Sequence, residues 1–238
     1  MSDLVETARD AMNLVVGLDA DLFRVIALSL AVSLSATALA TAIGLPLGAA
    51  LSIFRFSGRS LLILLANALL GLPPVVVGLA LYLLLSRTGP LGVLGILFTP
   101  TAMVVAQFLL ALPIVVALSH RALEGVWREY GDDLLVSGAS RGSAIPHVLS
   151  IGRRGALTAS LAGFGRSISE VGAILIVGGN IAGYTRTMTT TIVLQTSMGN
   201  FAFALALGFV LITISVLVSA CAFAFAAGPR RARFQDIA

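Results

Sequence analysis

Two opposite charges, Arg166 and Glu170, stand four residues apart in the otherwise apolar segment RSISEVGAILIVGGN. On one helix that spacing places both side chains on the same face, where they can neutralise each other within the chain or across a two-fold axis. In hydrocarbon an isolated charge costs on the order of 3 kcal/mol or more, so each charge needs a partner. The pair is therefore either purely structural or part of the lining or support of a polar path, together with its small and polar neighbours Gly165, Ser169 and Gly172.

A second group of polar residues follows Asn180, in the stretch GYTRTMTTTIVLQT. It offers hydrogen-bond donors of the kind that can bind an anion, namely Tyr184, Thr185, Arg186, Thr187, Thr189, Thr190 and Thr191. The one charge among them, Arg186, could steer an anion inward, pair with an acidic residue of another protein, or be an ordinary surface arginine. Three further polar residues are either lining of the path or hydrogen bonds between helices: Gln195, Thr196 and Asn200.

The sequence predicts no catalytic centre and no cofactor in this chain. It contains no lysine, so it cannot build the Gly-Lys-Ser or Gly-Lys-Thr phosphate loop of an ATPase. The only histidines, His120 and His147, are predicted to be solvated loop residues and not metal ligands. Ser169 has no histidine base in its apolar segment. Cys221 is the only cysteine and is predicted to pack among apolar residues.

The composition identifies lipid as the solvent of this chain. Hydrophobic residues make up 58% of its 238 residues and charged residues only 11%. Long stretches without charge, such as 25–54, 60–86 and 188–229, exceed the roughly 20 residues that cross a bilayer. We therefore expect an all-α membrane protein with five crossings, at Phe23–Phe54, Leu61–Leu85, Thr101–Ser119, Leu157–Val177 and Phe201–Ala227.

The arginines predict the orientation, because positively charged loops stay in the cytoplasm. Ten arginines fall on one side of the five crossings: Arg55, Arg59, Arg121, Arg128, Arg141, Arg153, Arg154, Arg230, Arg231 and Arg233. The other side holds Arg9, Arg24, Arg87 and Arg186. We expect residues 1–22 outside the cell without a cleaved leader, a single transmembrane domain over 23–228, and a cytoplasmic tail over 229–238. All fifteen basic residues are arginines that flank apolar runs, so a nucleic-acid-binding face is not expected.

Proline and glycine predict irregular helices. The first crossing should tilt, extend beyond the lipid, or bend near Gly44 and Pro46. The segment from Gly71 to Pro74 predicts a break in the second crossing, which is either a simple kink or a gating hinge. Residues 86–100, rich in glycine and proline, predict an external turn or a short re-entrant loop.

Charge returns in residues 120–155, which are predicted to form a cytoplasmic loop. Its central string, DDLLVSGASRGSAIPHVLSI from Asp132, predicts one helix that ends at Gly138 and a second short helix that Ser140 caps. A solvated hairpin without a partner is the alternative. The string resembles the cytoplasmic loop of ABC importer permeases, in which an acidic residue precedes a glycine by six positions. Asp133, Leu134 and Ile151 depart from the family's two small residues and closing proline.

This resemblance implies the fold of a type I ABC importer permease, in which the loop forms a coupling helix that docks in a cleft of the ATPase. Docking residues carried over from it are Asp132, Gly138, Ala139, Ser140 and Arg141. The arginine, the glutamate four residues later, the following glycine, and Gly179 with Asn180 resemble the oxyanion branch of the family. The continuation from Gly183 resembles tungstate permeases most and molybdate permeases next.

The same resemblance implies a homodimer in a bacterial inner membrane, two copies of an ATPase that binds ATP, and an external binding protein. Residues expected to line or support the path are Arg166, Ser169, Glu170, Gly172, Asn180, Thr189, Gln195 and Thr196, with Thr185 and Arg186 at the outer mouth. The main alternative is an ion-coupled secondary transporter that uses Arg166 and Glu170 as a relay. A membrane-embedded enzyme is a third, weaker alternative.

Overall fold

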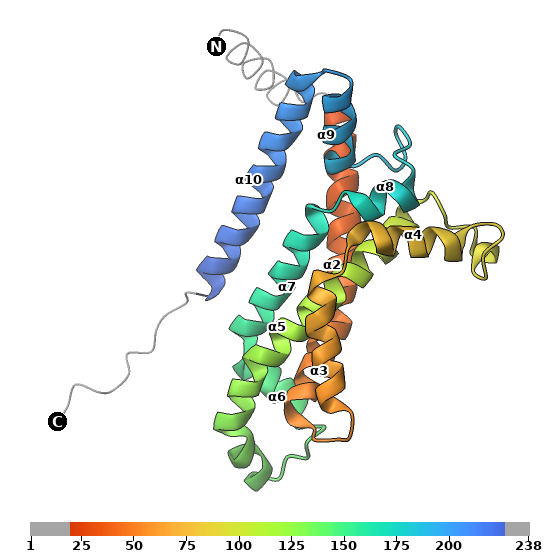
Figure 1. Cartoon of the computed structure of the whole chain (residues 1–238). Coiled ribbons are helices and arrows are strands. Elements are labelled where there is room, and N and C mark those ends of the chain that lie inside the picture. The colour runs from red at the N-terminus through yellow and green to blue at the C-terminus, as the bar shows by residue number, and fades with distance from the viewer. Residues whose placement is uncertain (1–19, 227–238) are drawn as a thin grey trace.

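The computed structural model describes residues 20–226, and within this range the chain is helical without strands. Three helices are long enough to cross a membrane: α2 (Ala20–Ile53), α5 (Pro100–Val136) and α10 (Phe201–Ala226) (Figure 1). Two further spans are bent pairs of shorter helices. Counting each pair as one span gives five, the number that the sequence predicts. Residues 1–19 and the tail 229–238, with their arginines, lie outside the described residues.

The second span is broken where the sequence predicts it. Helix α3 (Arg59–Ala68) continues into a 3-10 turn, η1 (Leu69–Gly71), and α4 (Pro74–Leu85) then leaves at 102°. Leu72 is extended, with φ −61° and ψ 121°, as residues before proline prefer. Pro73 and Pro74 have no N–H to donate, so the helical ladder stops without leaving buried donors.

The fourth span is also broken, which the sequence did not predict. Instead of one helix over 157–177, α7 (Arg153–Ile168) and α8 (Gly172–Gly178) meet at 58°. The cause lies in residues 169–171. The Glu170 N–H donates to the Ser167 carbonyl in a tight turn, and the Glu170 carbonyl accepts a hydrogen bond from the Thr189 side chain, so neither continues the helical ladder.

The first span, α2, runs through Gly44 and Pro46 without interruption. Glycine here permits close helix contact. A Cβ added at Gly44 would lie 2.8 Å from Val115 Cγ1 of α5, and one added at Gly48 would overlap the Ser119 hydroxyl. Helices α2 and α5 therefore form a closely packed trunk along much of their length (Figure 1).

The third span is longer than predicted, because α5 continues through residue 136 and takes up the first half of the predicted loop 120–155. Its extension is held by an apolar cluster in which Leu123 and Trp127 meet Ile53 of α2 and Val148 of α6 (Ala144–Ile151). His120 is consequently 5% exposed within α5, so its assignment to a solvated loop was wrong. His147 lies exposed on α6.

The remaining elements close the end of the molecule opposite α6 (Figure 1). Residues 86–99 form a turn with a short 3-10 helix, η2 (Gly92–Leu94), and the Phe98 N–H donates to the Val177 carbonyl at the end of α8. Helix α9 (Met188–Ser197) starts with a capping box between Thr187 and Thr190 and packs beside α10.

We expect Gly48→Ala to destabilise the protein by about 1–3 kcal/mol, because the added methyl group forces α2 away from α5. Equilibrium unfolding in mixed detergent, followed by the fluorescence of Trp127, the single tryptophan, measures this loss. The control is Gly125→Ala on α5, where a Cβ meets nothing within 4 Å and helix propensity improves by about 1 kcal/mol. Equal stability of the two variants would contradict the close packing.

Candidate functional site

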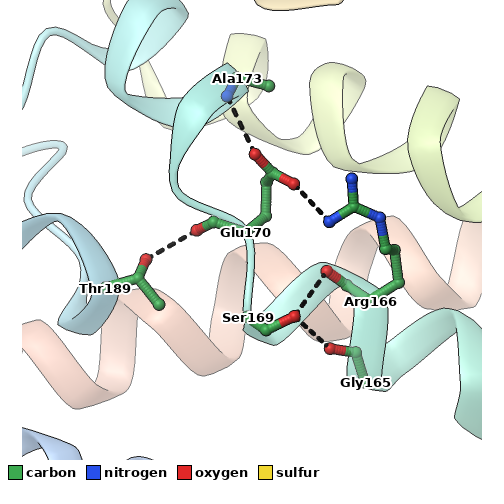
Figure 2. A network of polar contacts seen from close by, with 6 residues as sticks. All are labelled: Gly165, Arg166, Ser169, Glu170, Ala173 and Thr189. Atoms are coloured by element: carbon green, nitrogen blue, oxygen red, sulfur yellow. Dashed lines mark hydrogen bonds and ion pairs between the residues drawn. The ribbon is translucent and has the colours of Figure 1, made fainter. Parts of the chain in front are cut away.

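Glu170 occupies the break between α7 and α8 and is 2% exposed (Figure 2). One carboxylate oxygen, Oε2, accepts a hydrogen bond from Arg166 Nη1 at 2.7 Å. The other, Oε1, accepts from the backbone N–H of Ala173 at 3.0 Å. The carboxylate thus joins the last turn of α7 to the first turn of α8.

These contacts explain how a buried carboxylate is tolerated. Arg166 neutralises its charge through a bidentate-capable guanidinium, and the Ala173 N–H is one of the donors that every helix start leaves free. The Arg166 side chain is 28% exposed, so the pair lies at the edge of the packed interior with its positive end toward the surface. Such a pair presents little net charge to whatever passes beside it.

The backbone at the break is tied to two more helices. Thr189 Oγ1 of α9 donates to the Glu170 carbonyl at 2.7 Å. A Cβ added at Gly172 would lie 2.9 Å from Val75 Cγ2, so α4 approaches α8 closely at this point. Ser169 is exposed, and its hydroxyl bonds to the carbonyls of Gly165 and Arg166 on its own helix (Figure 2).

The ion pair forms within one chain, which is one of the two arrangements that the sequence left open. The expectation that Arg166 and Glu170 share one face of a continuous helix was wrong, because α7 ends at Ile168. Glu170 instead reaches back across the turn to Arg166. The turn, and not a helix, sets the geometry of the pair.

The threonines that the sequence analysis assigned to an outer mouth are buried and already hydrogen-bonded. Thr185 Oγ1 donates to the Gly178 carbonyl and accepts from the Ile181 N–H. Thr187 and Thr190 cap α9, and Thr191 Oγ1 donates to the Thr187 carbonyl. In this conformation these hydroxyls hold the loop in shape and are not turned toward open space, contrary to the donor role expected from sequence.

Arg186 is half-buried and borders a cavity of about 320 Å³ that Asp21, Arg24 and Tyr184 also line. Its Nη2 donates to the Asn180 carbonyl at 3.4 Å. Among the described atoms, Arg186 Nε and Asn180 Oδ1 are buried without a hydrogen-bond partner. Asn180 has φ +50°, in the left-handed region that asparagine tolerates better than most residues.

Gln195 and Thr196 of α9, which the sequence analysis assigned to the path or its support, are not among the hydrogen-bond partners of Glu170 in the described residues. Thr196 borders a separate cavity of about 240 Å³ with Phe201 and Leu205 of α10. Gln195 is half-buried, and its backbone carbonyl accepts a hydrogen bond from the Asn200 N–H at the turn into α10. Thr189 is therefore the predicted α9 residue that contacts the ion-pair site.

At the opposite end, α5 closes with a Schellman motif at Gly138. The Ala139 N–H donates to the Leu134 carbonyl and the Gly138 N–H to the Leu135 carbonyl. Gly138 has φ +91°, which confirms the predicted helix end and its need for glycine. We call residues 137–143 together with α6 the elbow.

Within the elbow, Gly138, Ser140 and Arg141 are exposed and Ala139 is half-buried. Asp132, just before the elbow, is also exposed. Ser140 Oγ accepts from the Ser143 N–H, so it caps the turn that leads into α6. The helix itself starts later than predicted, at Ala144. His147, which the sequence placed in a loop, joins this exposed surface on α6.

Removing one partner of the ion pair should cost more than removing both. We expect Glu170→Gln to lose about 3 kcal/mol of stability, because the Arg166 charge is left unpaired. The double variant Arg166→Gln with Glu170→Gln should lose less, since no charge remains. Unfolding of four proteins in mixed detergent gives the coupling energy: the wild type, the single variants Arg166→Gln and Glu170→Gln, and the double variant. If the double variant is as unstable as the sum of the single variants, the pair is not coupled.

Comparison with known proteins places the chain in a family. No family model matches it. It is 38% identical to the tungstate uptake system permease protein TupB of Peptoclostridium acidaminophilum over 206 residues, 84% of this chain and 88% of the relative. It is 41% identical to a probable anion ABC transporter permease protein of Haloferax volcanii over 184 residues, 75% and 79% of the two chains.

A more distant relative is the molybdenum transport system permease protein ModB of Azotobacter vinelandii, 33% identical over 132 residues, 51% of this chain and 57% of the relative. The two longer alignments run across most of both chains, and the all-helical fold with five apolar spans agrees with them. The chain belongs to the permease family of ABC transporters.

Proposed function

We propose that the chain is the membrane permease subunit of an ATP-driven importer that moves an oxyanion into the cell, tungstate in first place and molybdate in second. The observation that carries this proposal is the 38% sequence identity with a tungstate uptake permease, which extends over 84% of this chain and 88% of the relative. Tungstate and molybdate are tetrahedral dianions of the same shape, so hydrogen-bond geometry in a pore separates them poorly. Selection then belongs to a protein that binds the anion first.

The energy for transport comes from a partner. With no lysine the chain cannot hold ATP through a phosphate loop, so hydrolysis must come from another protein. The resemblance to ABC importer permeases implies that this protein is a cytoplasmic ATPase present in two copies. Their docking surface is the elbow, through Gly138, Ala139, Ser140 and Arg141, together with Asp132 just before it. Two features support this role: the elbow protrudes at one end of the molecule (Figure 1), and its Schellman motif fixes its shape before a partner binds.

Orientation follows from the charges at the elbow end. Among the described residues, seven arginines belong to elements at that end: Arg55, Arg59, Arg121, Arg128, Arg141, Arg153 and Arg154. The positive-inside rule then places the elbow in the cytoplasm and the start of α2 outside. The outer mouth, with Thr185 and Arg186, faces an external binding protein. A second copy of the chain completes the path in the cytoplasmic membrane.

The Arg166–Glu170 pair supports the path beside the break of the fourth span. Gly172 and Thr189 hold the break against α4 and α9. Because the pair is neutral as a unit, it shapes the wall without trapping an anion, and a conducting path requires such weak binding. Ser169, Asn180, Gln195 and Thr196 remain candidates for the lining or its support.

Docking should depend on the left-handed turn at Gly138. We expect Gly138→Ala to weaken association with the ATPase by about tenfold, because alanine pays roughly 1–2 kcal/mol in this conformation. Gly138→Asn should weaken it less. Gly142→Ala is the matched control, since a Cβ there also meets nothing within 4 Å but φ is not positive. Co-purification and ATPase stimulation measure the effect, and equal behaviour of all three variants would argue against the elbow as the docking surface.

Uptake should require ATP and the complete complex. In vesicles with the permease, its ATPase and its binding protein, we expect ATP-dependent accumulation of tungstate and, with the same permease, of molybdate. Vesicles that contain the permease alone, under a proton or sodium gradient, are the comparison. Accumulation there without ATPase would favour the ion-coupled carrier.

A further inference from the structure

Helix α3 has an unusual attachment to the rest of the molecule. None of its residues is buried, whereas α2, α4, α5 and α7 each contribute several buried side chains. Leu61, Leu62, Leu64 and Leu65 are exposed along it. Apolar packing therefore does little to fix α3 against the trunk, and its position must depend on other contacts.

The first such contact is Arg59, at the start of α3. Its Nε donates to the Leu51 carbonyl near the end of α2 at 2.7 Å. Its Nη2 lies 3.4 Å from Glu124 Oε1 of α5, and the two side chains are 13% and 26% exposed. Arg128 Nη2 lies 3.2 Å from the same carboxylate oxygen. One arginine thus ties α3 to both helices of the trunk.

The second contact is Asn67, near the other end of α3. Its side-chain oxygen accepts a hydrogen bond from the Arg121 guanidinium of α5. Its Nδ2 donates to the Ile63 carbonyl at 2.7 Å, which fixes the orientation of the amide. We call Arg59, Asn67, Arg121 and Glu124 the clasp. It holds α3 at both ends through polar groups on one short segment of α5.

The clasp sits between the elbow and the Glu170 site. Residues 121–124 belong to the extension of α5 that ends at Gly138, and Leu123 packs against Val148 of α6. In the other direction α3 leads through the break at residues 71–73 into α4. On α4, a Cβ added at Gly78 would lie 2.8 Å from the Cα of Ala173. The N–H of this same Ala173 donates to the Glu170 carboxylate.

We propose that the clasp makes α3 move with the cytoplasmic half of α5, so that displacement of the elbow by the ATPase reaches α4 and the Glu170 site. Arg59, Asn67, Arg121 and Glu124 are then positioning residues for coupling, and this inference rests on the proposed function. Polar ties suit this task, because they link α3 to α5 at two points without a large apolar interface that would have to be repacked.

The test compares ATP hydrolysis with uptake in the reconstituted complex, with tungstate as the probe. We expect the double variant Asn67→Leu with Glu124→Gln to keep docking and ATP hydrolysis but to lower the tungstate transported per ATP at least about fivefold. Asn67→Asp, which keeps an oxygen for Arg121, should retain the wild-type ratio.

A cross-link supplies the rescue. In a background with Cys221→Ser, the variant Asn67→Cys with Arg121→Cys should be uncoupled while reduced, and a flexible thiol cross-linker between the two cysteines should restore transport per ATP. A purely structural role would lower uptake and hydrolysis in proportion. Any of three results would overturn the clasp. These are uptake and hydrolysis that fall in proportion, an unchanged ratio of transport to ATP in Asn67→Leu with Glu124→Gln, and a cross-link that fails to restore this ratio in Asn67→Cys with Arg121→Cys. Absence of ATP-driven uptake by the wild-type complex would instead overturn the proposed function.

Discussion

The structure depends on one constraint: in lipid, backbone polar groups and charges must find their partners inside the protein. Both breaks in the spans obey it, by different chemistry. At Leu72 and Pro73 the ladder ends where proline has no donor to satisfy. At Glu170 the ladder ends because the residue's own carboxylate and carbonyl replace helical partners. At these two breaks of the described residues, the sequence either removes the donor or supplies another partner for the groups that leave the helical ladder.

Glu170 consequently serves as a joint between helices. Its carboxylate connects Arg166 of α7 to Ala173 of α8, and its carbonyl receives Thr189 of α9. A lone carboxylate at this depth would be costly, and the same desolvation makes each of its contacts strong once formed. The residues that look most functional in the sequence are therefore also those that fix the angle between α7 and α8.

Features that depend on neighbours in sequence were predictable, and features that depend on distant partners were not. Charge-free length indicated the spans, Pro73 and Pro74 the first break, and Gly138 the end of α5, because each acts through local geometry. The second break depends on Thr189, 19 residues after Glu170. Burial of His120 and the extension of α5 depend on α2 and α6. The contact between Arg59 and Glu124 spans 65 residues, and no local pattern announces it.

The helices divide into two classes by how they are held. Helices α2 and α5 meet through Gly44 and Gly48 at distances that tolerate no added atom, so they form a rigid trunk. Helix α3 buries no residue, so its position depends mainly on a few polar contacts at its ends. Close packing admits only discrete rearrangements of the trunk, whereas the hydrogen bond and the ion pair of the clasp fix α3 to one segment of α5 at two points. A gated path needs both kinds of attachment: a frame that keeps its shape, and a wall segment that follows the part of the frame to which it is tied.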